Sequence, residues 1–315
     1  MEKRALQPAH ASALEAIGNT PMVQLRRIVP AGCGRVFVKL EWYNPTGSKK
    51  DRMALAMIEG AEKRGDLKPG MTVVEFSGGS TGAGLAFVCG VKGYRFRLIT
   101  GDAFGKEKID MMRALGAEVE IISSPDGKIS KELVQAMIAR ARAISEEPNT
   151  YWTDQLTNPD VPTGFVSLGE EILAQLDGKV DAVCDTIGTS GTLIGIARAF
   201  KEANHPALLV ALEPVASPIL TAGRSGSHHV DGVGLGFIPA KYEPALVDRA
   251  MAIEENEARA ICRELAQKEG LFCGTSSGMN VAGAIALARE LGPDSTVVAV
   301  ACDTGLKYLQ SGLFD

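Results

Sequence analysis

Two adjacent lysines, Lys49 and Lys50, stand in the turn NPTGSKKDR (44–52), which leads into a segment with a helical pattern. A lysine that forms a Schiff base must be neutral part of the time, and burial or a neighbouring cation lowers the pKa of an ammonium group. The positive end of a helix dipole acts in the same direction. The turn therefore suits a reactive lysine, and the alternative is a solvated helix start in which Asp51 offsets the charge.

The 35 glycines among 315 residues make up about 11% of the chain, whereas ~7% is usual. They gather in four loops, SGGSTG (77–82), TIGTSGT (186–192), DGVGLGF (231–237) and GTSSG (274–278). Loops in which the backbone approaches a ligand closely favour glycine. TIGTSGT joins a predicted strand to a predicted helix, so its N–H groups at the helix start suit an anion such as phosphate. An ordinary strand-to-helix turn with a Ser or Thr cap is the alternative.

Three other ligand or catalytic motifs are absent or incomplete. The chain contains no GxxxxGK[ST] loop, and DGVGLGF runs into Ile238-Pro239 without a helix to receive a pyrophosphate. GTSSG matches the GxSxG pattern of serine hydrolases, with Ser276 as the nucleophile. Such enzymes place their histidine after the serine, but all four histidines of this chain precede Ser276. The sequence therefore disfavours a nicotinamide-dinucleotide enzyme and a serine hydrolase.

Composition excludes several broad classes. The net charge is −5, the pI is about 5.6, and no basic patch or tail is present, so we expect no nucleic-acid partner. No apolar run approaches the ~20 residues that span a bilayer, and residues 1–21 lack the apolar core of a signal peptide. The six cysteines are scattered and form no CxxC pair, which predicts free buried thiols. These features predict a cytoplasmic protein without a membrane or metal site.

Short apolar runs alternate with helical patterns along the chain. Strands are predicted at 71–76, 95–100, 118–122, 180–185, 207–214 and 296–303. This alternation predicts an α/β fold with two open, mostly parallel twisted sheets, each covered by helices. A boundary near 146–155 would separate domains 1–150 and 151–315, with part of the first 40 residues packing on the second. We expect the active site in the cleft between the domains, because ligands of open α/β folds bind beyond the carboxyl ends of the strands.

In chain order, these loops resemble the motifs of the cysteine synthase (O-acetylserine sulfhydrylase) family. That family belongs to the fold-type II pyridoxal-phosphate enzymes, which are similar to the tryptophan synthase β subunit. The lysine turn resembles N-P-x-G-S-x-K-D-R, SGGSTG resembles TSGNTG, and TIGTSGT resembles GxGTGGT. Further matches are IGNTPMVQL (17–25), HHVDGVGLGF (228–237), GTSSG and DTGLKYL (303–309). The resemblance covers essentially the whole chain.

The resemblance implies pyridoxal 5'-phosphate as the cofactor, with its phosphate on domain 151–315. Lys50, directly before Asp51-Arg52, would be the Schiff-base lysine and the catalytic base, and Lys49 would point away. Besides Lys50, the residues implied for cofactor binding are Ser80, Gly188, Thr189, Ser190, Gly191, Thr192 and Ser276. The residues implied for substrate binding are Ser77, Gly78, Ser80, Thr81, Gln155 and Gly232. Ser276 would offer a neutral hydroxyl to the pyridine nitrogen, which favours loss of a β-substituent over racemisation.

The family's activity implies β-replacement by ping-pong covalent catalysis, in which O-acetyl-L-serine and sulfide give L-cysteine and acetate. Related reactions stay open: β-replacement or β-elimination on O-phosphoserine, on serine with homocysteine, or on cysteine with cyanide. A non-catalytic binding relative is a further alternative, against which the retained Lys50 and loop glycines argue. The resemblance also implies a homodimer, and it suggests serine acetyltransferase as a protein partner.

Four residues depart from the motifs that the chain resembles. Ser80 stands where the substrate loop has asparagine and Gly78 where it has serine, while Thr186 and Ser190 replace glycines of the phosphate loop. Ser80 and Gly78 remove up to two side-chain contacts to the substrate carboxylate or the cofactor. We expect the vacated space to admit a bulkier leaving group or nucleophile, and we expect the two domains to close on the substrate.

Overall fold

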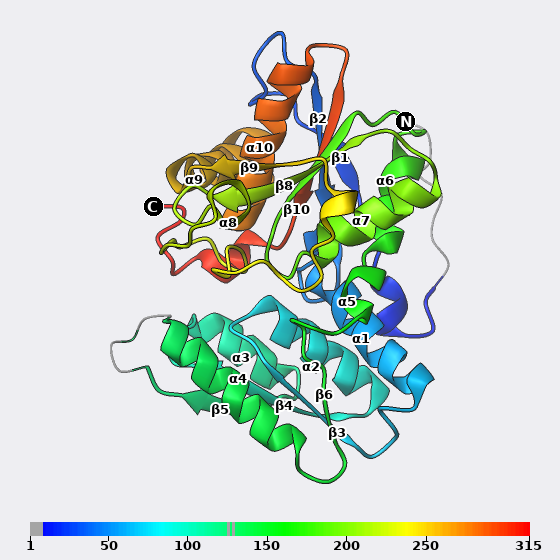
Figure 1. Ribbon diagram of the computed structural model, residues 1–315, viewed down its shortest axis with the longest axis vertical. Coiled ribbons are helices and arrows are strands. Elements are labelled where there is room, and N and C mark those ends of the chain that lie inside the picture. Colours follow the sequence, from blue (N-terminus) through cyan, green and yellow to red (C-terminus); the bar gives the residue numbers. More distant parts are fainter. Residues whose placement is uncertain (1–8, 125–126, 128–129) are drawn as a thin grey trace.

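Parallel strands form two separate sheets in the computed structural model, which describes residues 9–124, 127 and 130–315 (Figure 1). The larger sheet has the order β1 (Met22–Gln24), β2 (Arg35–Leu40), β10 (Thr296–Ala301), β7 (Ala182–Thr186), β8 (Leu208–Pro214) and β9 (Arg249–Ile253). The smaller sheet has the order β5 (Glu118–Ile122), β4 (Arg95–Gly101), β3 (Thr72–Phe76) and β6 (Thr150–Trp152). Every neighbouring pair is parallel except β1 and β2. The predicted fold class is confirmed.

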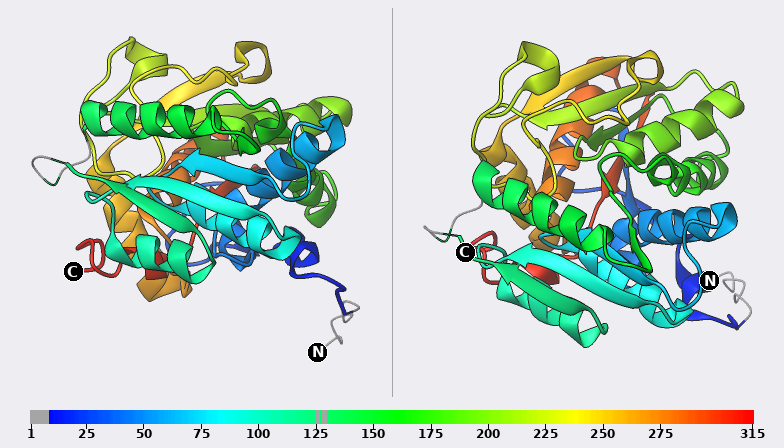
Figure 2. Two further views of the ribbon diagram at one scale, coloured as in Figure 1. Left: turned by 90° about the horizontal axis from the view of Figure 1, so that it is seen from below. Right: turned by 60° about the horizontal axis from the view of Figure 1, so that its bottom comes forward.

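Helices cover both faces of the smaller sheet (Figure 2). Val73 and Leu98 belong to a core shared with α1 (Lys50–Arg64), α2 (Ser80–Lys92) and α3 (Lys106–Ala114). The alternate residues Val74 and Ile99 pack against α4 (Lys131–Ser145) on the opposite face. This alternation follows from the period of two along a strand, which places successive side chains on opposite faces.

The larger sheet is covered in the same manner. Val183 and Val298 share a core with α6 (Val166–Gln175) and α7 (Gly191–Glu202), and that core is continuous with the one under α1 and α2. Ala182 and Val297 face α9 (Glu255–Glu264) and α10 (Thr275–Leu291). Two short helices, α5 (Asp160–Thr163) and α8 (Ile219–Ala222), complete the set of α-helices in the described residues. The continuous core therefore packs the two sheet layers against each other.

Helix α1 begins directly at the lysine turn. Its Met53, Met57 and Ala61 recur at helical spacing and are fully buried, and burial of such a stripe stabilises a helix. The helix ends at Gly65, whose φ of +80° is the left-handed conformation that commonly terminates helices. Lys50 therefore stands at the first position of a helix that is anchored along its length.

The carboxyl ends of three strands meet at the lysine turn. SGGSTG follows β3, TIGTSGT continues from β7, and residues 302–304 follow β10. Ser48 forms an isolated β-bridge with Asp303, and the Lys49 N–H donates to the Cys302 carbonyl at 2.8 Å. The lysine turn is thereby fixed to the carboxyl end of β10 in the larger sheet.

Two expectations from composition can be compared with the structure. All six thiols are free, and five of them are buried, with Cys33 partly exposed. Among the helices of the described residues, none has the length and apolar character required to cross a membrane.

Candidate active site

The structure separates the two adjacent lysines. Lys49 is buried, and its Nζ donates to both carboxylate oxygens of Asp185, at 2.9 and 2.7 Å. Lys50 is half-buried, and its Nζ has no hydrogen-bond partner among the described residues. Lys49 is thus held in an ion pair, while the amine of Lys50 is available for chemistry.

The surroundings also separate their proton affinities. Burial lowers the pKa of Lys50 from 10.5 to about 8, and the positive charge of Lys49 acts in the same direction. Burial would lower the pKa of Lys49 as well, but the Asp185 carboxylate outweighs it and raises that pKa above its usual value. Since a general base works best with a pKa near the operating pH, Lys50 is the better suited lysine.

The predicted phosphate-binding residues Gly188, Thr189, Ser190, Gly191 and Thr192 form the turn between β7 and α7 and the start of that helix. A Cβ at Gly188 would lie 2.1 Å from the carbonyl oxygen of Gly232, so no side chain fits there. Ser190 has a φ of +63°, in the left-handed region that favours glycine. The backbone N–H groups of Gly188, Thr189 and Ser190 have no acceptor among the described residues. Unpaired N–H groups at a helix start suit a phosphate.

Ser77 and Gln155 shape the predicted carboxylate site at the end of β3. Ser77 Oγ accepts from the N–H groups of Gly79 (3.1 Å) and Gly82 (3.0 Å), which leaves its hydroxyl proton for a ligand. Gln155 Nε2 donates to the Phe76 carbonyl at 2.9 Å, and its second proton remains available. Thr81, also predicted for the substrate, is buried in the first turn of α2.

A buried glutamate, Glu75, fixes the segment that contains Gln155. Glu75 accepts from the Gln155 N–H at 2.9 Å and from the Thr153 hydroxyl at 2.7 Å. Burial raises the pKa of Glu75 to about 7. The sequence reading gave Glu75 no role, because its function depends on contacts with residues about 80 positions away in the chain.

The expectation that Gly78 leaves open space is wrong. A Cβ at Gly78 would lie 2.1 Å from a ring carbon of Phe104, so the aromatic ring occupies the position that a side chain at 78 would take. Phe104 lies between β4 and α3 and packs against the core that includes Phe76 and Ile99. The loop therefore exchanges a small polar side chain for an aromatic wall contributed by another segment.

Ser80 is engaged by two charged residues that the sequence reading left without a role. Its Oγ accepts from Lys307 Nζ at 3.2 Å and lies 3.3 Å from Asp303 Oδ2. The Tyr308 hydroxyl donates to the same Asp303 oxygen at 2.9 Å. Lys307 and Asp303 are both buried. The motif DTGLKYL contains these residues, but no signal in that segment indicates a contact with Ser80, which lies more than 220 positions away in the chain.

Gly232 lies at a second contact between the two sheet layers. The preceding residue, Asp231, forms an ion pair with Lys108 of α3, and Lys108 Nζ lies 4.6 Å from the centre of the Tyr308 ring. The Gly232 carbonyl packs against Gly188, as described above. The predicted substrate residue Gly232 and the phosphate turn are therefore adjacent.

Ser276 is buried in the first turn of α10, beside the end of β10. Its neighbour Ser277 accepts from the Cys302 N–H at 2.8 Å. Two nearby polar atoms, Thr186 Oγ1 and Asp303 Oδ1, are buried without a partner among the described residues. Since buried polar atoms are nearly always paired, these atoms and the free N–H groups of the phosphate turn indicate that a polar ligand completes the site.

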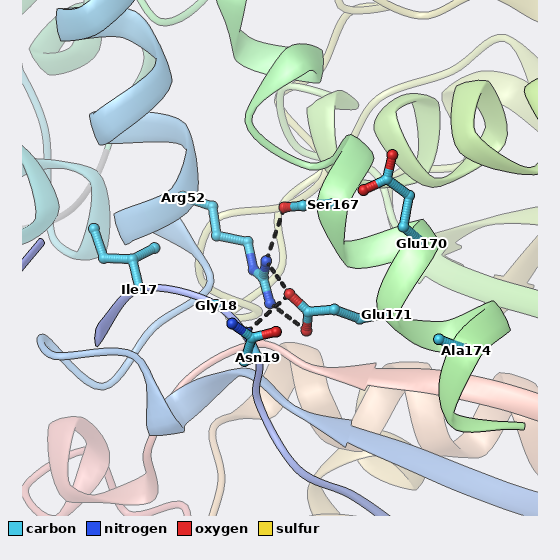
Figure 3. Close-up of a pocket in the computed structure, with 8 residues that line it drawn as sticks. All are labelled: Ile17, Gly18, Asn19, Arg52, Ser167, Glu170, Glu171 and Ala174. Carbon is cyan, nitrogen blue, oxygen red and sulfur yellow. Dashed lines mark hydrogen bonds and ion pairs between the residues drawn. The ribbon is translucent and has the colours of Figure 1, made fainter. Parts of the chain in front are cut away.

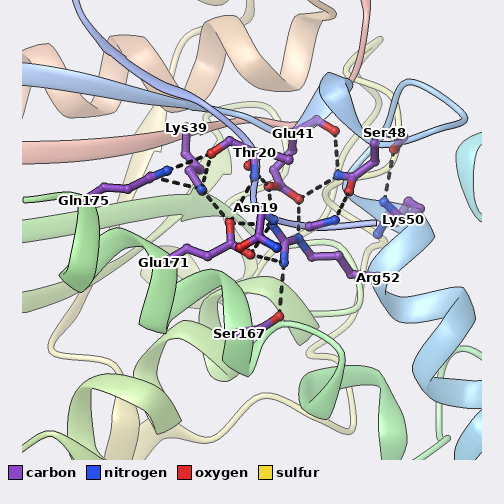
Figure 4. Close-up of polar contacts among 12 residues, drawn as sticks. Asn19, Thr20, Lys39, Glu41, Ser48, Lys50, Arg52, Ser167, Glu171 and Gln175 are labelled. Carbon is purple, nitrogen blue, oxygen red and sulfur yellow. Dashed lines mark hydrogen bonds and ion pairs between the residues drawn. The ribbon is translucent and has the colours of Figure 1, made fainter. Parts of the chain in front are cut away.

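A hydrogen-bonded network behind the lysine turn fixes its position (Figure 4). Arg52 forms paired hydrogen bonds with Glu41, at 2.7 and 2.9 Å, and with Glu171, at 2.8 and 2.9 Å. Lys39 Nζ donates to Glu171 and to the Thr20 carbonyl, both at 2.6 Å. Two cations and two anions therefore balance one another, which is the condition for stable burial of charges.

A cavity of about 350 Å³ opens beside this network (Figure 3). Its lining includes Gly18, Asn19, Arg52, Ser167 and Glu171. None of the predicted cofactor or substrate residues lines it. Two of the polar groups that face it are already paired, since Ser167 accepts from Arg52 at 3.1 Å and Glu171 accepts from the Asn19 N–H at 2.9 Å, while Glu170, which also lines the cavity, is exposed. This cavity accompanies the anchoring network and lies apart from the candidate active site.

Comparison with known proteins identifies the class to which this architecture belongs. Residues 13–303 match the family described as "Pyridoxal-phosphate dependent enzyme", so the chain belongs to that family and pyridoxal phosphate is its cofactor. Within that family it groups with the cysteine synthases. The chain is 39% identical over 302 residues to a cysteine synthase of Staphylococcus aureus, a match that covers 95% of this chain and 96% of the relative.

Solved structures of similar proteins show the same fold. The cysteine synthase of Entamoeba histolytica superimposes with a TM-score of 0.91 at 31% identity, covering 99% of this chain and 94% of the other. An O-ureido-L-serine synthase superimposes with a TM-score of 0.90 at 35% identity, covering 98% and 96%. Proteins with different amino-acid products therefore share this architecture.

The residues at the junction fit pyridoxal phosphate. The phosphate turn supplies unpaired N–H groups, Lys50 supplies a free amine, and the buried atoms without partners lie on the strands and turns around them. We propose that Lys50 attaches the cofactor, that the turn 186–192 holds its phosphate, and that Ser276 contacts its ring. When bound, the cofactor withdraws electrons from the substrate Cα, which eases loss of the α-proton.

Proposed function

We propose that the chain catalyses β-replacement, in which O-acetyl-L-serine and sulfide give L-cysteine and acetate. One observation carries the proposal. Of two adjacent lysines, Lys50 has a free amine, and it lies where the phosphate turn (186–192) meets the loop SGGSTG (77–82). The other lysine is held by Asp185. The 39% identity to a cysteine synthase supports this choice of substrates.

The residues of the site take separate roles in this reaction. Lys50 accepts the α-proton of the amino acid, for which its lowered pKa of about 8 suits it. The hydroxyl proton of Ser77 and the second amide proton of Gln155 hold the substrate carboxylate. The β-substituent then leaves as acetate, sulfide adds at the β-carbon, and Lys50 returns its proton to Cα. Sulfide needs little activation, so no further base is required for the addition step.

A second candidate is the same chemistry on another β-substituted alanine: O-phosphoserine, serine with homocysteine, cysteine with cyanide, or β-elimination. Two observations favour it. Phe104 and Ser80 give the substrate loop a different wall and a shorter polar side chain. An O-ureido-L-serine synthase is 35% identical over nearly the whole chain.

A matrix of substrates distinguishes the two candidates. The holoenzyme is mixed with each of several β-substituted alanines in combination with sulfide, thiosulfate, cyanide or homocysteine, and products are identified by mass spectrometry. The highest kcat/KM is expected for O-acetyl-L-serine with sulfide. A higher value for another pair would replace the first candidate with the second, and release of pyruvate as the main product would identify an eliminating enzyme.

Ser80→Asn is expected to shift the ranking of donors towards O-acetyl-L-serine by about ten- to a hundredfold in relative kcat/KM. An asparagine amide both donates and accepts, and a hydrogen bond to a charged group contributes about 1.5–3 kcal/mol. Initial rates across the donor panel measure the shift, with the exposed Ser123→Asn as control. A uniform change for every donor would show that Ser80 does not set specificity.

Gly78→Ser is expected to lower kcat/KM for all donors alike, because the added atoms meet Phe104.

Assembly is a separate part of the proposal. We propose a homodimer that acts on small molecules, with serine acetyltransferase as a protein partner, on the basis of the family to which the chain belongs. Light scattering coupled to size-exclusion chromatography would measure the mass, and a monomer at micromolar concentration would contradict the dimer.

A further inference from the structure

A buried ion pair between Lys49 and Asp185 lies next to Lys50 in the candidate active site. The side chains of Lys49 and Asp185 are only 7% and 1% exposed, and their charged atoms are 2.7 Å apart. Replacing a buried ion pair by well-packed apolar residues of similar volume is often neutral or stabilising, so a buried ion pair is weak evidence for a purely stabilising role. The position of this pair therefore calls for a function beyond packing.

The ion pair connects the lysine turn to the phosphate turn and to the end of β10. Asp185 is the penultimate residue of β7 and also accepts from Asn280 Nδ2 at 2.6 Å. Asn280 Oδ1 accepts from the N–H of Thr186, the first residue of the phosphate turn, at 2.7 Å. On the other side, the Lys49 N–H donates to the Cys302 carbonyl of the β10 end. Lys49, which directly precedes Lys50, is thus linked through Asp185 and Asn280 to the phosphate turn and through Cys302 to the end of the strand beside Ser276.

We propose that Lys49 is a positioning residue whose fixed positive charge increases the neutral fraction of the neighbouring Lys50 amine near neutral pH, with Asp185 holding that charge in place. This inference rests on the proposed function only in taking Lys50 as the reaction lysine. It assigns a role to a lysine whose own amine is held in an ion pair with Asp185.

Burial favours the neutral form of the Lys50 amine most strongly, and three charged groups on the elements around it add to or oppose that effect. Lys49, in its own turn, favours the neutral amine. Asp185 from β7 and Asp303 from the end of β10 favour the charged form. The Cys302 thiol also lies there, but burial raises its pKa to about 11, so it is uncharged near neutral pH. From α2, packed on the other side, Gly84 approaches the Lys50 backbone. Lys49 is the one cation in this set, so removing its charge leaves only groups that favour protonation.

The pH dependence of cofactor uptake tests the proposal, because only a neutral amine attacks the aldehyde of pyridoxal phosphate. The full chain is freed of cofactor, and the rate of pyridoxal phosphate uptake is measured by absorbance between pH 6.5 and 9.5. The useful quantity is the ratio of the rate at pH 7 to the rate at pH 9.5, since general losses of binding cancel in it. Pyridoxal phosphate has its own titrations, but they are common to every variant.

Lys49→Met is expected to lower this ratio about tenfold, which corresponds to a shift of about one pH unit in the midpoint. Lys49→Arg keeps the charge and is expected to keep the wild-type ratio. Lys49→Met with Asp185→Asn removes both charges, leaves no lone buried ion, and is expected to lower the ratio by a smaller factor. The double variant keeps the test decisive if Lys49→Met does not fold.

Borohydride trapping and peptide mapping accompany each measurement. If wild type and variants carry the adduct on Lys50 but share one ratio, the ion pair is only structural and the inference is overturned while the proposed function stands. If the wild-type adduct lies on a residue other than Lys50, both fail. A lower ratio in Lys49→Met and the double variant, with the wild-type ratio in Lys49→Arg, supports the inference.

Discussion

Replacing Lys50 with alanine is expected to abolish covalent cofactor binding and to lower turnover by at least roughly a thousandfold. The substitution removes the attachment amine together with the proposed proton acceptor, and general acid–base catalysis alone contributes about 10²–10⁴-fold. Lys50 lies at the first position of α1 and makes no side-chain hydrogen bond in the described residues, so the fold should tolerate the change. Absorbance of the purified protein and initial rates with the preferred substrate pair measure the two effects.

The exposed Lys63→Ala, on the same helix, is the matched control and is expected to retain both properties. Lys50→Arg should fail as alanine does, because a guanidinium remains protonated at any accessible pH. An alanine variant at position 50 that still binds the cofactor covalently would show that another amine carries it.

Arg52→Ala is expected to lower the free energy of unfolding by about 3–5 kcal/mol, the range for breaking one partner out of a buried ion pair. The substitution leaves the carboxylates of Glu41 and Glu171 facing each other with Lys39 as the remaining cation beside Glu171. It also detaches the start of α1 from α6. Urea unfolding followed by circular dichroism measures the loss, and weaker cofactor retention should accompany it.

Arg64→Ala provides the comparison within the same helix. Arg64 pairs with Asp66 and Asp160 near the surface, where its side chain is 40% exposed. Exposed ion pairs contribute about 0–1 kcal/mol, so this variant should stay close to wild type. Equal losses for the two arginines would mean that the buried network does not anchor the lysine turn.

Much of the fold can be predicted from short windows of sequence, because buried parallel strands are continuous apolar runs. The run at 71–76 is the strand β3, and the run at 207–214 is β8. Strand β2 has no such signal, since the charged Lys39 interrupts RVFVKL. Lys39 is buried there because Glu171 and the Thr20 carbonyl satisfy it. Only the folded chain brings Glu171, 132 positions away, to that strand.

The candidate site divides in the same way. The glycine-rich loops can be recognised in the sequence by their composition and by their positions after predicted strands. The structure brings 77–82, 186–192 and Lys50 to one junction. The aromatic wall of Phe104 and the Lys307–Ser80–Asp303 contacts could not be predicted, because each depends on the packing of segments far apart in the chain. The partner of Lys49 is equally remote, at Asp185.

Borohydride reduction of the cofactor-loaded protein, followed by peptide mapping, tests most directly whether the lysine turn is the centre of the chemistry. Reduction fixes the cofactor to the nitrogen that holds it, and fragmentation of the peptide covering 44–64 distinguishes the two neighbouring lysines by mass. We expect one pyridoxyl group per chain, on Lys50. A pyridoxyl group on Lys49, or on a lysine outside the turn, would contradict the assignment of the active site.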